Sequence, residues 1–297
     1  MNEKEFAFSR FHPIPLFCYF LSLMLFTMFT ENPVMLLAAL LGGICFNAAT
    51  NTLRKSLSDI KFYIPMFLLI ALTNPLFSHN GATPLFFMND NPVTLEAILC
   101  GVNISVMLTA VMLACQSFTK VMESDKLLSL MGGLSPKLCT VLSMALRFIP
   151  LFKRKWKEIH DAQASIGYFK RDSFTEKLLA NARVFSALVT WALESSVDTA
   201  SSMSARGYGL KDKKSFSLFR FTKKDAYLLC AVALLTALTL AGVIFGKTDF
   251  AFYPVITDIN ADIAAIVSYA AFSVLSFIPF IIEVKEAMHW KYLRSKI

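Results

Sequence analysis

One uncharged run decides the fold class of this chain. It reads IAAIVSYAAFSVLSFIPFII from Ile263 to Ile282 and lies between two acidic residues, Asp262 and Glu283. Because a helix needs about 20 mainly apolar residues to cross a hydrocarbon core of about 30 Å, this run predicts a membrane span. The run from Ala226 to Gly246 is nearly as clean and also lies between charged residues. The C-terminal part of the chain is therefore expected to cross a membrane twice.

Four further apolar runs lie in the N-terminal part of the chain. The run from Ala97 to Phe118 is uncharged and predicts a span, with its polar side chains facing other helices rather than lipid. The other three fall short of about 18 residues and are expected to be tilted, broken or partly interfacial. They are Ile14 to Thr30, Pro33 to Ala49 and Phe62 to Phe77. The sequence thus predicts an all-α, polytopic membrane protein with about six transmembrane helices.

The composition agrees with this class. The 297 residues are 56% hydrophobic and only 17% charged, with a mean hydropathy of +0.55, which is too apolar for an ordinary soluble domain. With both termini on the inner side, every one of the 29 lysines and arginines except Lys247 lies in an inner segment. The positive-inside rule therefore predicts that both termini are cytoplasmic. The net charge of +8 is then a topological signature beside a lipid membrane, and no nucleic-acid partner is expected.

The inner segment between the two groups of spans is far too long for a simple connection, so we expect it to be structured. We divide the chain into three parts. Residues 1–118 form the N-terminal transmembrane helices, 119–224 a cytoplasmic helical module, and 225–297 a C-terminal transmembrane hairpin followed by a basic cytoplasmic tail.

The module is expected to contain one short and two long helices. The short amphipathic helix runs from Val121 to Met131 and is closed by Gly132 and Gly133. The first long helix has Ser135 as its N-cap and Pro136 at its first position, is kinked near Pro150, and ends near Ser165 before Gly167. After a polar turn from Lys170 to Ser173, the second long helix runs from about Thr175 to Ala205 and ends at Gly207 and Gly209.

The ends of the two long helices resemble each other. The first reads DAQASIGY from Asp161 to Tyr168, and the second reads SSMSARGY from Ser201 to Tyr208. Two similar tips suggest two similar sockets on partner proteins, and the Arg206 guanidinium could reach carboxylates or exposed carbonyls there. The alternative is structural. Arg206 would then only complement the negative end of a helix dipole, worth about 0.3 to 1 kcal/mol, and both glycines would be plain C-caps.

Several motifs carry a resemblance to a known family. They are SFT at 117–119, MALRFIPL at 144–151, AQ at 162–163 and ARG at 205–207. With these motifs the chain resembles the transmembrane T component of energy-coupling factor transporters. The resemblance implies a coupling module that holds together two ABC-type ATPases and a membrane-embedded, substrate-binding S component. Each of the two long coupling helices then docks into one ATPase through its end.

The resemblance assigns the docking residues position by position. The second motif is intact, and the docking residues that it implies are Ser204, Ala205, Arg206 and Gly207. The first motif departs from the family, because its matching residues are Ala164, Ser165, Ile166 and Gly167, with isoleucine where the family usually has arginine. We expect Ile166 to fill an apolar pocket, which would suit two non-identical ATPases. The stretch from Lys153 to Lys155 is also more basic than the acidic-leaning segment of the family.

Arg147 and Pro150 have two interpretations. Arg147 could pin the two coupling helices together at the kink, or it could be a snorkelling arginine near the membrane surface.

The function implied by the resemblance is that of a coupling subunit in the bacterial cytoplasmic membrane. It would transmit ATP-driven motion for the uptake of a vitamin or a metal ion such as cobalt. One alternative is an ordinary ABC importer permease, because Asp161-Ala162-Gln163 followed by Gly167 loosely matches the inner-loop pattern of that class. Such a permease needs one coupling helix per chain, and the duplicated tip therefore favours the T component.

Two further classes are weaker. An ion-coupled secondary carrier usually places ionisable residues near the midplane, and none of the six apolar runs contains one. An enzyme is not expected, because the four histidines are scattered without an HExxH motif and no Walker-type phosphate loop is present. We therefore expect no catalytic residues, no metal site and no cofactor, and we expect ATP to be hydrolysed by partner subunits.

Overall fold

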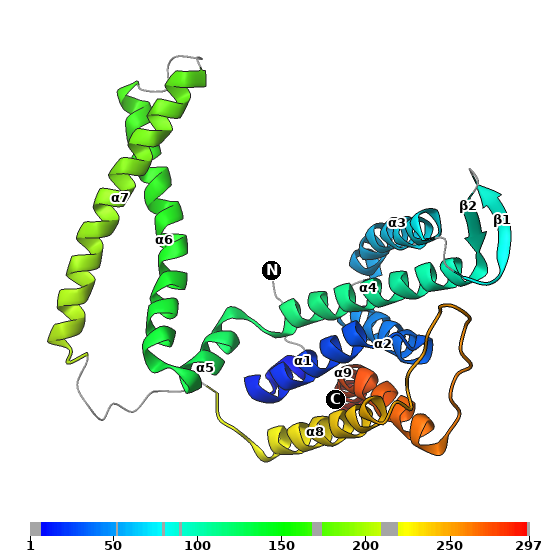
Figure 1. Ribbon diagram of the computed structural model, residues 1–297. Coiled ribbons are helices and arrows are strands. Elements are labelled where there is room, and N and C mark those ends of the chain that lie inside the picture. The colour runs from blue at the N-terminus through cyan, green and yellow to red at the C-terminus, as the bar shows by residue number, and fades with distance from the viewer. Residues whose placement is uncertain are drawn as a thin grey trace. The chain divides into compact units, whose positions relative to one another are not determined.

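The computed structural model describes residues 7–51, 53–78, 81–88, 91–167, 174–208 and 219–295. Helices dominate this part of the chain, together with one two-stranded antiparallel hairpin (Figure 1). The first half contains η1 (Phe8–Arg10), α1 (Pro13–Phe29), α2 (Pro33–Thr50), α3 (Leu53–Phe77), β1 (Pro84–Met88), β2 (Asn91–Thr94) and α4 (Leu95–Val121). The second half contains α5 (Ser124–Leu134), α6 (Pro136–Ile166), α7 (Phe174–Ala205), α8 (Lys223–Ile244) and α9 (Ile263–Arg294).

The chain divides into two compact units. The first combines Met1–Leu127 with Phe219–Ile297, and the second is Leu128–Leu218. The first unit therefore holds η1, α1 to α4, the hairpin, α8 and α9, whereas α6 and α7 belong to the second. The predicted division at residues 118 and 224 refers to the two sides of a bilayer, and it stays a prediction.

Among the described residues, four helices are long and apolar enough to cross a membrane: α2, α4, α8 and α9. Two apolar helical stretches are shorter, namely α1 and the part of α3 from Lys61 to Phe77. The prediction of an all-helical, polytopic membrane protein is confirmed. All three short runs of the N-terminal part are helices. The run from Pro33 was expected to fall short of a span, but it belongs to α2, which is long enough, whereas the other two do form shorter apolar helices.

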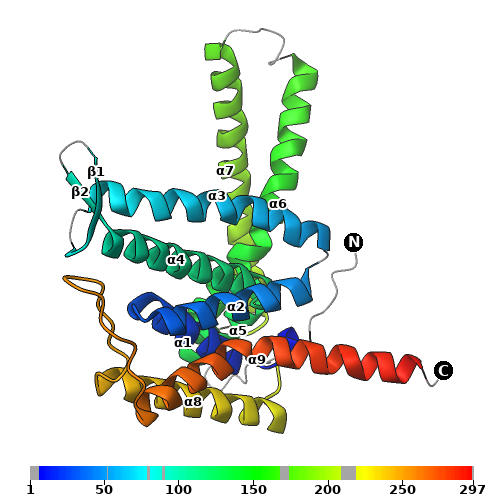
Figure 2. The ribbon, with the colours of Figure 1, turned by 90° about the vertical axis from the view of Figure 1, so that its right-hand side faces the viewer.

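Small residues let the helices of the first unit approach closely. In this unit α9 packs against α2 and α8, while α4 packs against α1, α2 and α3 (Figures 1 and 2). A β-carbon on Gly42 of α2 would collide with Ser276 of α9, and one on Gly242 of α8 would collide with Ser268 of the same helix. Two glycine contacts eight residues apart on α9 thus bring both neighbouring helices to its backbone.

Several helices extend beyond the apolar runs that predicted them. Helix α3 begins at Leu53 rather than near Phe62, and α9 continues from Ile282 to Arg294, beyond the neighbouring helices of its unit (Figure 2). Hydropathy marks the part of a helix that lipid can surround, and charged residues such as lysine and glutamate continue the helix readily. The short hairpin between α3 and α4 was not predicted.

Helix α5 differs from its prediction at both ends. It begins at Ser124 instead of Val121, which ends α4, and it runs through Gly132 and Gly133 to Leu134. The glycines were expected to end it, and this was wrong. Pro136 ends it instead, because a proline disfavours the helical conformation of the preceding residue, and Ser135 is accordingly extended with φ −151° and ψ 102°. Ser135 occupies the N-cap position of α6 without a capping hydrogen bond from its side chain.

Candidate functional site

The first predicted docking tip is the end of α6, and glycine determines its shape. Gly167 has φ 97° and ψ 11°, in the left-handed region, and its N–H donates to the carbonyl of Ala164 at 3.0 Å. A residue with a β-carbon would cost roughly 1–2 kcal/mol in this conformation. The prediction that Gly167 closes the first long helix is confirmed. Tyr168 and the turn from Lys170 to Ser173 lie outside the described residues.

The second tip, at the end of α7, is also closed by a glycine with a positive φ, and it has one further backbone hydrogen bond. Gly207 has φ 74°, and its N–H donates to the Ser204 carbonyl at 3.0 Å. The N–H of Tyr208 donates to the Met203 carbonyl, also at 3.0 Å. These two bonds are the pair that defines a Schellman motif. Gly209, the other predicted terminator, lies outside the described residues.

The two tips can be aligned position by position in the sequence. In 161–167 and in 201–207 the third and seventh residues are partly buried, and all the others are exposed. In both, the glycine N–H donates to the carbonyl three residues earlier. The predicted docking residues Ala164, Ser165 and Ile166 therefore correspond to Ser204, Ala205 and Arg206, and all six are exposed. The two ends share one backbone shape and differ in the chemistry of one projecting side chain.

That side chain is a cation at one end and an apolar group at the other. Ile166 is 75% exposed, so the first tip presents an apolar side chain at its surface. Arg206 is exposed, and among the described residues no carboxylate forms an ion pair with it. Backbone N–H groups already occupy the carbonyls of Ser202, Met203 and Ser204. The guanidinium is therefore not required as a helix cap.

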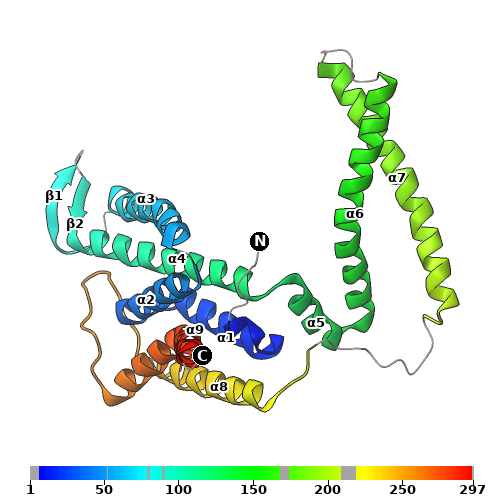
Figure 3. The same ribbon diagram turned by 180° about the vertical axis from the view of Figure 1, so that it is seen from behind.

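Helices α6 and α7 form an antiparallel pair that presents the tips at opposite ends. The two helices run in opposite directions (Figures 1 and 3) and cross near the middle of each, where Phe152 of α6 contacts Trp191 of α7, whereas their joined ends lie apart (Figure 2). The first tip lies at the joined ends, and the second lies at the far end of α7. Because α7 has 32 residues, it is about 48 Å long, and the tips lie roughly that far apart along it.

Aromatic residues hold the crossing of the two helices together. Phe152 of α6 meets Trp191 of α7 edge to face with ring centroids 6.1 Å apart, and Lys155 Nζ lies 5.7 Å from the Trp191 ring centre. Phe148 stacks on Phe152 at 5.7 Å. The spacing of four residues between Phe148 and Phe152 puts both on one face of α6, and this was the signal that sequence reasoning overlooked.

Arg147 and Pro150 both lie in α6, where the helix continues past the proline, and both are exposed. The aromatic contact just described, rather than Arg147, joins the two helices in this structure. The role of Arg147 within a complex stays a prediction.

Long apolar side chains are exposed along both helices of the module. Those more than half exposed are Leu138, Val141, Ile166, Phe174, Leu178, Leu179, Phe185, Leu193 and Val197. Exposed apolar surface of this extent on two packed helices is typical of a surface that contacts another protein or a membrane.

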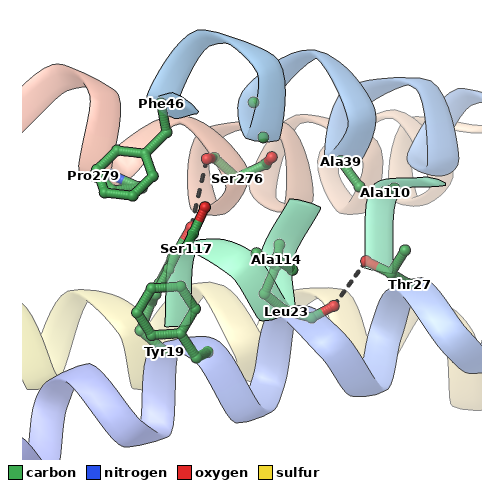
Figure 4. Close-up of a pocket in the computed structure, with 13 residues that line it drawn as sticks. Tyr19, Leu23, Thr27, Ala39, Phe46, Ala110, Ala114, Ser117, Ser276 and Pro279 are labelled. Atoms are coloured by element: carbon green, nitrogen blue, oxygen red, sulfur yellow. Dashed lines mark hydrogen bonds between the residues drawn. The ribbon is translucent and has the colours of Figure 1, made fainter. Parts of the chain in front are cut away.

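The first unit encloses a small cavity among α1, α2, α4 and α9 (Figure 4). It offers the centre of a water molecule about 10 Å³, which is room for roughly one water. Beside it, Tyr19 Oη donates to the Ser276 carbonyl at 3.4 Å, and Ser276 Oγ donates to the Ala38 carbonyl at 3.0 Å. This cavity is too small for a hydrated ion or a vitamin. Within the described ranges, no three histidine, cysteine, aspartate or glutamate side chains lie close enough together to bind a metal ion.

A bundle of apolar helices with a helical module whose two ends are exposed is the architecture of a multi-pass membrane protein. The chain belongs to the CbiQ family of cobalt transport proteins, whose sequence model matches residues 12–218. This is the family of the T components of energy-coupling factor transporters, the permease component of an ABC-type cobalt transporter. The match extends from the start of α1 beyond α7. A comparison with curated proteins found no match.

Proposed function

We propose that this chain is the coupling subunit of an energy-coupling factor importer. It transmits ATP-driven motion from two ABC-type ATPases to a substrate-binding S component. The observation that carries the proposal is the pair of exposed, glycine-terminated helix ends with one backbone shape on a single rod-like module. Two ends of one kind suit two partners of one kind, and their separation of about 48 Å lets both partners bind at once.

The sockets of the two ATPases differ in this proposal. Arg206 supplies directed donors and a charge that cannot be removed, so its socket is lined by carboxylates or free carbonyls. Ile166 supplies only apolar surface, so its socket is an apolar pocket. Two non-identical ATPases would account for this difference.

The S component is proposed to cover the exposed apolar residues of α6 and α7. Burying apolar surface contributes about 25 cal/mol for each Å² removed from water, so even part of this face could hold a partner. The S component would also capture the cargo. Cobalt is the cargo that the family name suggests, and a vitamin is the alternative.

In this arrangement the chain itself is not an enzyme, and the partner ATPases hydrolyse the nucleotide. We place it in the bacterial cytoplasmic membrane with both termini in the cytoplasm, on the strength of the lysine and arginine distribution. We expect this chain to bind no cofactor and no nucleic acid.

Purification of the tagged chain from its native membrane tests the proposal. Two ATPases and one small hydrophobic protein are expected for each copy of the chain. An ordinary ABC permease would instead yield two copies of the permease for two ATPases. A secondary carrier would yield the chain alone, and vesicles containing only the chain would then accumulate solute in response to an ion gradient.

Arg206→Glu tests the charged socket. It should remove one ATPase from the purified complex and abolish cobalt uptake, while membrane insertion is retained. Arg154→Glu is the matched control, because Arg154 is an exposed arginine of α6 away from either tip. Full uptake by Arg206→Glu would contradict the docking role of this tip.

A further inference from the structure

The second unit is joined to the first by two chain connections only, one after Leu127 and one before Phe219. Any displacement that travels along the chain from the coupling module to the membrane helices must pass through these two connections. Both of them are bonded, on the side of the first unit, to the same short segment. We call this segment, residues 8–12, the N-terminal clasp.

The first connection is attached to the clasp by a buried lysine. Lys126, one residue before the chain leaves the first unit, is only 6% exposed. Its Nζ donates to the carbonyl of Ser9 at 2.6 Å and to the carbonyl of Val121, at the end of α4, at 2.8 Å. A buried ammonium group is tolerated when its donors are used, so these bonds hold the start of α5 to the clasp and to α4.

The second connection is attached by a buried carboxylate. Asp225, in the first turn of α8, is 3% exposed, and its Oδ1 accepts from the His12 N–H at 2.8 Å. Its Oδ2 accepts from the N–H of Thr222 at 2.8 Å and from the Thr222 hydroxyl at 2.6 Å. The ring of Phe221 also meets the His12 ring at 5.3 Å. One carboxylate thus fastens the re-entering chain to the clasp.

The clasp itself is packed into the membrane helices. Phe8 is completely buried, and its ring lies 5.5 Å from that of Tyr19 in α1 and 6.1 Å from that of Phe46 in α2. The Phe8 N–H donates to Glu283 of α9 at 3.1 Å, and Arg10 pairs with Glu286 of the same helix at 2.9 Å. A displacement of the clasp must therefore also displace side chains of α1, α2 and α9.

We propose that Lys126 and Asp225 are positioning residues for transport. Lys126 and Asp225 bind the two connections to the same segment, the N-terminal clasp. Motion of the coupling module therefore displaces the clasp, and with it α1, α2 and α9, together. This inference rests on the proposed coupling function. It adds the place at which force enters the membrane helices.

Amide hydrogen exchange of the purified chain in lipid nanodiscs tests the clasp without any partner. Lys126→Met removes the donors and keeps the length of the side chain. Exchange should become about tenfold faster in residues 219–226, at the other connection, as expected when one charge-assisted hydrogen bond no longer supports the clasp that holds them. Asp225→Asn should in turn make exchange about tenfold faster in residues 121–127, at the first connection. If each variant changes exchange only around its own site, the clasp does not link the two connections.

Lys247→Met is the matched control for this experiment. It removes a lysine from a 2.6 Å ion pair with Asp262, distant in sequence from both connections, and should leave exchange in both of them unchanged. If Lys126→Met cannot be purified as a folded protein, Asp225→Asn carries the same test, because it retains the shape of the carboxylate.

The coupling role is tested in the complex with the ATPases and the S component. Both variants should hydrolyse ATP at the wild-type rate and transport about tenfold less cobalt for each ATP, a ratio that a merely structural role would not change. Lys126→Arg, which keeps a cation, should restore part of the ratio. An unchanged ratio would overturn the inference. If the wild-type chain binds no ATPase, the proposed function fails, and the exchange experiment still decides whether the clasp joins the connections.

Discussion

Replacing Gly207 with alanine should weaken the docking of the ATPase at the end of α7. The residue has φ 74°, a conformation that costs a residue with a β-carbon roughly 1–2 kcal/mol. The free alanine tip has two options. It can keep its shape under strain, or it can unwind and lose the bonds from Gly207 to Ser204 and from Tyr208 to Met203.

The magnitude follows from the comparison of these two options. Each lost backbone bond costs about 0.5–1.5 kcal/mol net, which is comparable with the strain that unwinding relieves. Native and unwound tips should then be similarly populated in the free protein. A partner that binds only the native tip must recover that difference, up to about 2 kcal/mol. The dissociation constant should rise by about threefold to thirtyfold.

Titration of nanodisc-embedded chain with the purified ATPase measures this effect. Gly207→Asn should bind nearly as tightly as wild type, because asparagine adopts the left-handed conformation readily. Gly132→Ala is the matched control. Gly132 lies inside α5, where an added β-carbon would make ordinary contacts with Cys139, at 3.5 Å from its Sγ and 4.0 Å from its Cβ. If Gly207→Ala binds like wild type, or if Gly207→Asn is as weak as alanine, backbone conformation is not what the socket requires.

Three further predictions concern packing: the first two are measured by thermal unfolding of the purified chain, and the third by binding of the two ATPases. Gly42→Ala should lower the unfolding midpoint, because overpacking at this position costs about 1–3 kcal/mol. The added β-carbon would collide with the Ser276 side chain and lie 2.8 Å from the Ser276 backbone oxygen. A raised midpoint would contradict the close packing of α2 on α9. Asp59→Ala should lower the free energy of unfolding by about 1–3 kcal/mol. The Asp59 carboxylate accepts hydrogen bonds from side chains of α2 and α4, and these donors would lose their partner. Asp59→Asn should cost less, and equal costs for the two variants would refute this account. Trp191→Ala should loosen the crossing of α6 and α7 and weaken binding of both ATPases together, whereas an effect on only one would show that the tips are positioned independently.

The helices and the two tips could be predicted because the signals for them are local. An uncharged apolar run identifies a helix for the membrane, and this predicted the interiors of α4, α8 and α9. A glycine after small exposed residues predicts a helix end, and Gly167 and Gly207 both have the positive φ that this requires. The same local reasoning failed at Gly132 and Gly133, because the proline that follows determined where α5 ends.

The sequence by itself determined the membrane class, the family and the duplicated, unequal tips with Ile166 and Arg206, because hydropathy and backbone conformation depend on short stretches of chain. Only the tertiary structure decided which distant residues meet. Lys126 bonds to Ser9 across 117 residues, and Asp225 bonds to His12 across 213. Such pairs depend on which helices are neighbours, and an apolar helix surface with small residues on several sides does not specify its neighbour. The packing of glycine against serine between α2, α8 and α9 supplies that information in three dimensions.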